Sequence, residues 1–139
     1  MSHGIDLAQS ASVAEREDVG RTVHLKDDRD EPAYEGDTPV TVTIAGSYSK
    51  RYRRTQETLT QRMFKRRQTQ LTAEQFMANR VELVAACVLT WEGIRNGDKP
   101  LACSRENATL LLNAAPWILA QLEDAQADHA SFSPGSSTT

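Results

Sequence analysis

The chain has 139 residues, of which 39% are hydrophobic, 25% charged and 6% aromatic, and its formal net charge is -3. This length and composition are typical of one folded domain whose core contains few aromatic side chains. No run of 18 apolar residues occurs, and residues 1–10 lack a basic start and an apolar middle, so we expect neither a membrane span nor export.

The charge is unevenly distributed along the chain. Residues 1–40 hold ten acids and four bases, residues 41–67 hold eight bases and one acid, and residues 68–139 hold eight acids and four bases. One basic block therefore lies between two acidic segments, and this distribution is more informative than the small net charge.

Both ends of the chain are polar. Residues 1–20 show no sustained apolar period, so ordering them would cost more conformational entropy than their burial could offset. Residues 133–139 read Ser-Pro-Gly-Ser-Ser-Thr-Thr, a composition that does not pack. We therefore expect a mobile arm over residues 1–20, a single domain over residues 21–132, and a flexible tail over residues 133–139.

Two short strands are predicted between residues 21 and 45. The apolar residues that alternate with polar neighbours are Val23 and Leu25 in the first strand, and Val40, Val42 and Ile44 in the second. The acidic stretch between them contains Pro32 and Gly36, which favours a solvated connection rather than a tight two-residue hairpin. We expect the two strands to pair antiparallel.

Helices are predicted from residue 47 to residue 132. Ser47 or Ser49 is a suitable N-cap for a mostly solvated helix that runs through the basic block to about Gln70. Thr72 and Gln75 form a capping-box pattern for the next helix. Its apolar residues recur at spacings of four and three and are Met77, Val81, Val84, Val88 and Trp91.

Two further helices complete the predicted domain. Asn96-Gly97 and Lys99-Pro100 predict a loop, Ser104 caps the helix after it, and Pro116 suits the first turn of the last helix. The predicted fold class is α+β and mainly helical: an N-terminal antiparallel strand pair over about residues 21–45, followed by about four α-helices over about residues 47–132.

The sequence contains no pattern for catalysis, a cofactor or a metal. Cys87 and Cys103 lie in no CxxC pair, which indicates reduced thiols rather than a zinc site or a disulfide scaffold. The three histidines are scattered, and the glycines form neither GxGxxG nor a GK[ST] phosphate loop. We therefore predict that the protein is not an enzyme, with no catalytic, cofactor-binding or metal-binding residues.

The basic block is the chemical feature that stands out. A helix with eight positive groups attracts phosphate or an acidic protein surface. The alternative is that these residues solvate an exposed helix and pair with the acidic segments of the same chain. The overall acidic charge argues against nucleic acid as the partner.

Two stretches of the sequence resemble a known family. The first is residues 40–52, VTVTIAGSYSKRY, and the second is residues 83–132, with the anchors LVAACVLTWEGI, GDKPL, SRENATLLL and PWILAQLEDAQADHASF. Together they resemble the small tail assembly chaperones of long-tailed bacteriophages, whose shared patterns reflect packing rather than catalysis.

The resemblance implies a function in the cytoplasm of the infected bacterial host. The protein would keep the phage tape-measure protein soluble while tail-tube subunits polymerise around it, and it would be absent from the finished virion. In many members of that family a ribosomal frameshift adds a domain that meets the tail-tube protein, which is therefore a second candidate partner. Self-association is a third, because a two-stranded sheet leaves free edges.

The predicted partner-binding residues lie mainly on the basic helix. They are Arg51, Arg53, Arg54, Arg62, Met63, Phe64 and Arg66, together with Trp117. Two alternative functions remain open: a small nucleic-acid-binding or regulatory protein that uses the basic helix over residues 50–67, and a minor structural tail protein. Salt dependence distinguishes phosphate binding from apolar client binding.

Overall fold

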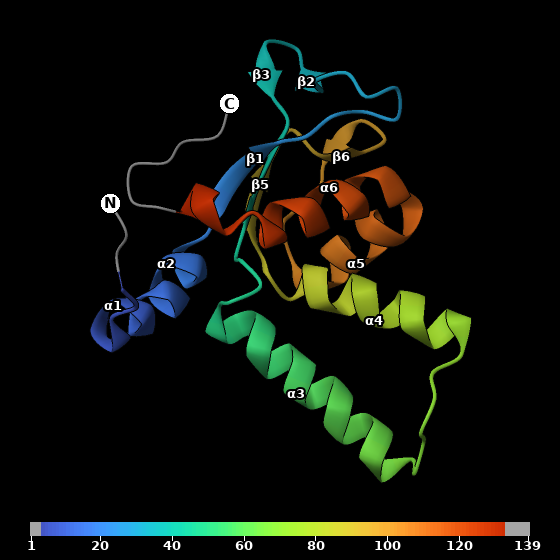
Figure 1. Cartoon of the computed structure of the whole chain (residues 1–139). Helices are drawn as coiled ribbons and strands as arrows, with labels where there is room; N and C mark the ends of the chain where they lie inside the picture. Colours follow the sequence, from blue (N-terminus) through green and yellow to red (C-terminus); the bar gives the residue numbers. More distant parts are fainter. Residues whose placement is uncertain (1–3, 133–139) are drawn as a thin grey trace.

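The computed structural model describes residues 4–132, so the tail predicted at residues 133–139 lies outside the described part (Figure 1). The helices in chain order are α1 (Leu7–Ala11), α2 (Val13–Val19), α3 (Lys50–Lys65), α4 (Ala73–Ala85), α5 (Arg105–Ala114), α6 (Pro116–Ala127) and the 3₁₀ helix η1 (His129–Phe132). The strands are β1 (Arg21–His24), β2 (Tyr34–Glu35), β3 (Thr38–Pro39), β4 (Thr41–Ile44), β5 (Val88–Glu92), β6 (Arg95–Asn96) and β7 (Lys99–Pro100).

The central sheet has three antiparallel strands in the order β1-β4-β5. Val42 in the central strand lies opposite Val23 on one side and Trp91 on the other. This row faces the core, whereas Thr43 and its neighbour Thr22, linked through their hydroxyl oxygens at 2.8 Å, occupy the other face. The alternation of apolar and polar residues therefore assigns one face of the sheet to the core.

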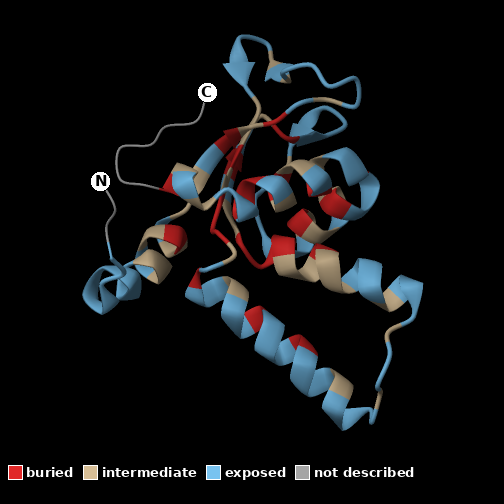
Figure 2. Cartoon of the chain, viewed as in Figure 1, coloured by how far each residue is buried: buried red, intermediate tan, exposed pale blue. Residues whose placement is uncertain are grey.

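The core lies between that face of the sheet and helices α4, α5 and α6, as the buried residues in Figure 2 show. Its fully buried members include Leu25, Val42, Ile44, Val84, Leu112, Leu119 and Leu122. Helix α3 contributes little to it and is exposed along most of its length. A helix with so little buried surface is available for other contacts.

The predicted fold class is wrong. The fold is roughly α+β, but its strands form three small separate sheets distributed along the chain, rather than an N-terminal pair followed only by helices. The predicted pairing of β1 with β4 does occur, in antiparallel register. A third strand, β5, joins the free edge of β4 from the C-terminal part of the helix that was predicted to run through Trp91.

The helix that was predicted to run through Trp91 ends at Ala85, because the residues that follow are more favourable in a β-strand of the central sheet. The segment Val88–Glu92 is rich in β-branched and aromatic residues, which pack well on a pleated surface. The register shifts between Thr43 and Ile44, which pair with Thr90 and Val88, so Leu89 is an extra residue in β5. Trp91 fixes the strand further by donating its indole N–H to the Leu101 carbonyl at 2.7 Å.

Two hairpins occur where loops were predicted. β2 pairs with β3 and β6 pairs with β7, each around a two-residue Gly-Asp turn. Gly36 and Gly97 occupy the first turn position with φ of 61° and 67°, a conformation that glycine adopts without strain. The predicted solvated connection over residues 27–38 therefore ends in a tight hairpin.

Part of the segment predicted as an arm is folded. Residues 7–19 form α1 and α2, and Glu17 on α2 is fully buried. Its carboxylate accepts hydrogen bonds from the Tyr48 backbone N–H at 2.8 Å and pairs with His129 Nδ1 at 2.7 Å. These contacts tie α2 to the start of α3 and to η1. Within residues 4–132, no helix is long and apolar enough to cross a lipid bilayer.

Candidate binding site

Helix α3 begins where three capping interactions meet. The Ser49 hydroxyl accepts from the Tyr52 N–H at 3.1 Å, as one of the two predicted N-caps should. Asp18 Oδ1, from α2, accepts from the N–H groups of Lys50 and Arg51 at 2.9 and 3.4 Å. The helix N-terminus is thus held by a hydroxyl and a carboxylate, both of which complement its dipole.

One flank of α3 lies along a groove shared with α4. The groove has a volume of about 650 Å³ and is lined from α3 by Leu59, Met63 and Phe64 and from α4 by Phe76 and Leu83. Phe64 is 77% exposed and Phe76 is 56% exposed, so both rings are largely in water. Large apolar side chains gathered along one groove are typical of a protein-binding surface; we call it the α3–α4 groove.

The α4 wall of this groove is set by local sequence. Thr72 and Gln75 form the predicted capping box, in which the Gln75 N–H donates to the Thr72 hydroxyl at 3.1 Å and the Thr72 N–H donates to the Gln75 amide oxygen at 3.0 Å. This cap starts α4 one turn before Phe76. Val81 and Val84 then face the core, which leaves Phe76 and Leu83, seven residues apart, on the groove side.

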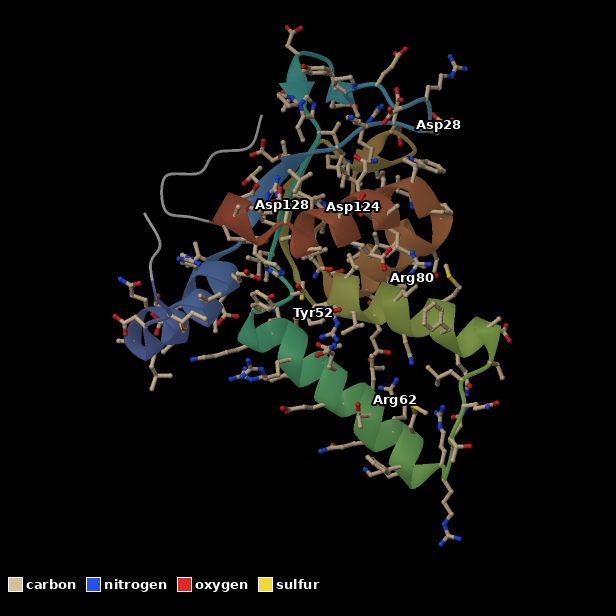
Figure 3. All side chains as sticks on the ribbon, in the orientation of Figure 1. Asp28, Tyr52, Arg62, Arg80, Asp124 and Asp128 are labelled. Carbon is tan, nitrogen blue, oxygen red and sulfur yellow. The ribbon has the colours of Figure 1, made fainter. Side chains whose placement is uncertain are left out.

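Ion pairs fix α4 relative to its neighbours. Arg62 on α3 forms a forked pair with Glu82 on α4, with N–O distances of 3.1 and 3.4 Å. Arg80 on α4 pairs with Glu123 on α6, with Nε 2.9 Å from a carboxylate oxygen, and this hydrogen bond raises the pKa of Arg80. Figure 3 shows Arg62 pointing from α3 toward α4, and Arg80 pointing from α4 toward α6.

The structure separates the predicted partner-binding residues into several places. Arg53, Met63 and Phe64 line the α3–α4 groove. Arg62 is committed to Glu82, and Arg66 lies beside it at the C-cap of α3. These positions do not form one continuous basic face.

The other three predicted residues lie elsewhere. Arg51 and Arg54 line a different hollow, on the flank of α3 away from the groove. Trp117 is 41% exposed and lies on α6, where its carbonyl accepts from the Gln121 side chain at 3.0 Å. The eight predicted residues therefore do not all line one groove or hollow.

Sequence reasoning missed the α4 side of the groove. Phe76 and Leu83 have no place in the stripe that contains Val81 and Val84, so they do not stand out in a search for one apolar face. A second apolar pair at a spacing of seven is the signal that identifies them. Arg105, which lines the hollow with Arg51 and Arg54, was missed because it lies about fifty residues from them in sequence.

Burial governs the chemistry of the two cysteines. Cys87 is fully buried at the end of α4, and desolvation raises the pKa of its thiol to about 11. Burial also raises the pKa of the Cys103 thiol, which belongs to an exposed residue. Neither environment favours the thiolate that a nucleophile needs. Among residues 4–132, no group of three or more His, Cys, Asp and Glu side chains is arranged to hold a metal ion.

Comparison with known proteins places the chain in a phage-derived class. Residues 46–137 match the YdaY prophage protein family, and this match covers more than half of the chain. The protein therefore belongs to the YdaY prophage protein family. No curated protein and no solved structure matches it significantly.

Proposed function

We propose that this protein is a non-enzymatic phage tail assembly chaperone that binds a helical segment of the tape-measure protein in the α3–α4 groove. The observation that carries the proposal is the groove itself, where Phe64 and Phe76 present exposed rings above an apolar floor that includes Leu59. Membership of a prophage family supports a phage process. The resemblance of residues 40–52 and 83–132 to tail assembly chaperones supports this particular process.

The shape of the groove suits a helix. A third helix laid between two packed helices buries its apolar residues at positions i, i+3, i+4 and i+7. The 16 residues of α3 span about 24 Å, which corresponds to four to five turns of a client helix. Arg53 and Glu57 lie at the groove rim and give polar contacts that orient the client.

The test is co-expression with the tape-measure protein from the same genome, with client solubility and co-elution measured at low and high salt. We expect a soluble complex that persists at high salt, because apolar burial is not weakened by screening. The double variant Phe64→Ala, Phe76→Ala should weaken co-elution by roughly 30-fold or more, as the loss of two aromatic anchors predicts.

Leu110→Ala provides the matched control. Leu110 is 64% exposed on α5, so the control removes a similarly exposed apolar side chain outside the groove and should retain the client. All three side chains are largely in water, and the variants should remain folded. A client that stays insoluble, or a complex that tolerates the Phe64 and Phe76 changes, contradicts the proposal. Binding of DNA or RNA only at low salt would favour the nucleic-acid alternative.

A further inference from the structure

A second hollow lies on the other flank of α3 and has a different chemical character. Its volume is about 420 Å³. Its charged lining consists of Lys50, Arg51 and Arg54 from α3, Arg105 from the start of α5, and Asp18 from α2. We call it the basic hollow. Four cations and one anion therefore surround one concave site.

The single carboxylate balances at most one of these four positive charges. Asp18 Oδ1 is already committed to the backbone N–H groups of the first turn of α3. Arg51 Nη1 donates to the Ala86 carbonyl at 3.4 Å, which is a neutral acceptor. Within residues 4–132, the side chains of Lys50, Arg54 and Arg105 form neither an ion pair nor a hydrogen bond.

Some of the other arginines of the molecule are arranged differently. Arg21, Arg62, Arg80 and Arg95 each pair with a carboxylate from another element. In the basic hollow, cations from two helices converge without such partners, so their mutual repulsion raises the free energy of the unliganded protein. An anion that enters the hollow removes this repulsion and gains charge-assisted hydrogen bonds.

We propose that the basic hollow binds a phosphate group. A phosphate dianion offers several acceptor oxygens, which the forked guanidinium groups of Arg51, Arg54 and Arg105 can engage from different sides. A carboxylate carries one charge on two oxygens and engages one such fork. The volume of about 420 Å³ also leaves room for the group to which the phosphate is attached.

The test compares inorganic phosphate with chloride at equal ionic strength, with the melting temperature of the full chain and calorimetric titration as readouts. Phosphate should raise the melting temperature of the natural protein. The variant Arg54→Gln, Arg105→Gln should lose at least tenfold in phosphate affinity. Because it also relieves repulsion, it should melt at or above the temperature of the natural protein in chloride, which shows that it is folded.

The control Lys65→Gln, Arg66→Gln removes the same charge from the far end of α3 and should bind phosphate within twofold of the natural protein. Absence of a phosphate-specific shift overturns the proposal. So does an equal loss of affinity in both variants, because it would show a general charge effect rather than a site. The groove variant Phe64→Ala, Phe76→Ala should retain the phosphate response, so this proposal stands or falls independently of client binding.

A second titration with a short DNA duplex identifies the source of the phosphate. If phosphate binds and the duplex also loses affinity in Arg54→Gln, Arg105→Gln but not in the control, the group belongs to a nucleic-acid backbone. If phosphate binds and the duplex does not, it belongs to a free phosphate compound. Duplex binding without a phosphate-specific shift contradicts a discrete site and overturns the proposal.

Discussion

Glu17 joins three parts of the chain through one buried side chain. Its two carboxylate oxygens contact the Tyr48 N–H and His129 Nδ1, and its backbone carbonyl accepts from the Gly46 N–H at 3.1 Å. The rings of Tyr48 and His129 stack with centroids 3.6 Å apart and cover the site. A carboxylate removed from water in this way requires all of its partners.

Gly46 is required by the same packing. A Cβ atom built at this position would overlap Glu17 Oε1 and would lie 3.0 Å from Phe132 Cζ. We expect Gly46→Ala to destabilise the protein by about 2 kcal/mol or more, because the carboxylate is buried and held at both oxygens. Glu17→Ala should cost about 1–3 kcal/mol through the unsatisfied Tyr48 N–H and the lost pair with His129.

The double variant should cost less than the sum of the two single variants, by about 0.5–3 kcal/mol, because the overlap disappears when the carboxylate is removed. Urea unfolding at pH 7 measures all four corners of this cycle. Strict additivity would show that the clash and the hydrogen-bonded carboxylate are unrelated.

At the scale of elements, signals that depend on neighbouring residues correctly predicted the starts of helices α3 to α6. Ser49, the Thr72–Gln75 box, Ser104 and Pro116 occupy the positions expected of them, because a cap acts within one turn of its own helix. For the same reason, only the α3 side of the α3–α4 groove could be predicted from the sequence. Met63 and Phe64 lie on the basic helix already singled out, whereas Phe76 becomes relevant only once α4 packs beside it.

The boundary between α4 and β5 explains why the sequence pattern predicted a helix that is too long. Val84, Val88 and Trp91 are spaced by four and three, which fits one helix face. In a regular strand, Val88 and Trp91 would point to opposite faces, but the extra residue Leu89 places both opposite inward-facing residues of β4. A bulged strand can thus show the same spacing of apolar residues as a helix. Only the free edge of β4, with which the segment can pair, favours the strand over the helix.

The α4–β5 junction also has a predictable pH response. Desolvation raises the pKa of the Cys87 thiol from its ordinary value of 9.0 to about 11, against smaller opposing effects of Ser49, Arg51 and Arg105. The unfolded chain releases this proton first, so stability is complete below pH 9 and falls as the pH rises toward 11. The expected loss is about 2–3 kcal/mol.

Urea unfolding at pH 8, 9, 10 and 10.5 measures this slope. Cys87→Ala should show a smaller decline over the same interval, since the other groups that titrate there remain in both proteins. An identical decline in the two proteins would assign the alkaline sensitivity to those groups instead of the buried thiol.

At the scale of the whole molecule, the fold extends beyond the segment that defines the family. The family match begins at residue 46, yet the central strand β4 and its partner β1 both precede it. Val42 and Ile44 on β4 are fully buried in the core, and β4 is the strand to which β5 pairs. The matched segment therefore contributes helices, the β6–β7 hairpin and one edge strand of the central sheet, but not the centre of that sheet.

We expect a fragment of residues 46–139 to lack cooperative folding. Without β4, the backbone of β5 is unpaired, and the apolar faces of α4 and α6 lose the surface against which they pack. Circular dichroism during thermal melting and amide hydrogen exchange measure this, with residues 4–139 as the folded control. A sharp melting transition in the shorter fragment would show that the helices form an independent unit.

The contact between Glu17 and His129 has a consequence for biosynthesis. The two residues are separated by 112 positions, and at a translation rate of about 5–20 residues per second the second is made roughly 6–22 seconds after the first. During this interval the carboxylate remains hydrated, because its imidazole partner does not yet exist. Helix α2 therefore leaves the ribosome well before the residue of η1 that completes its final environment.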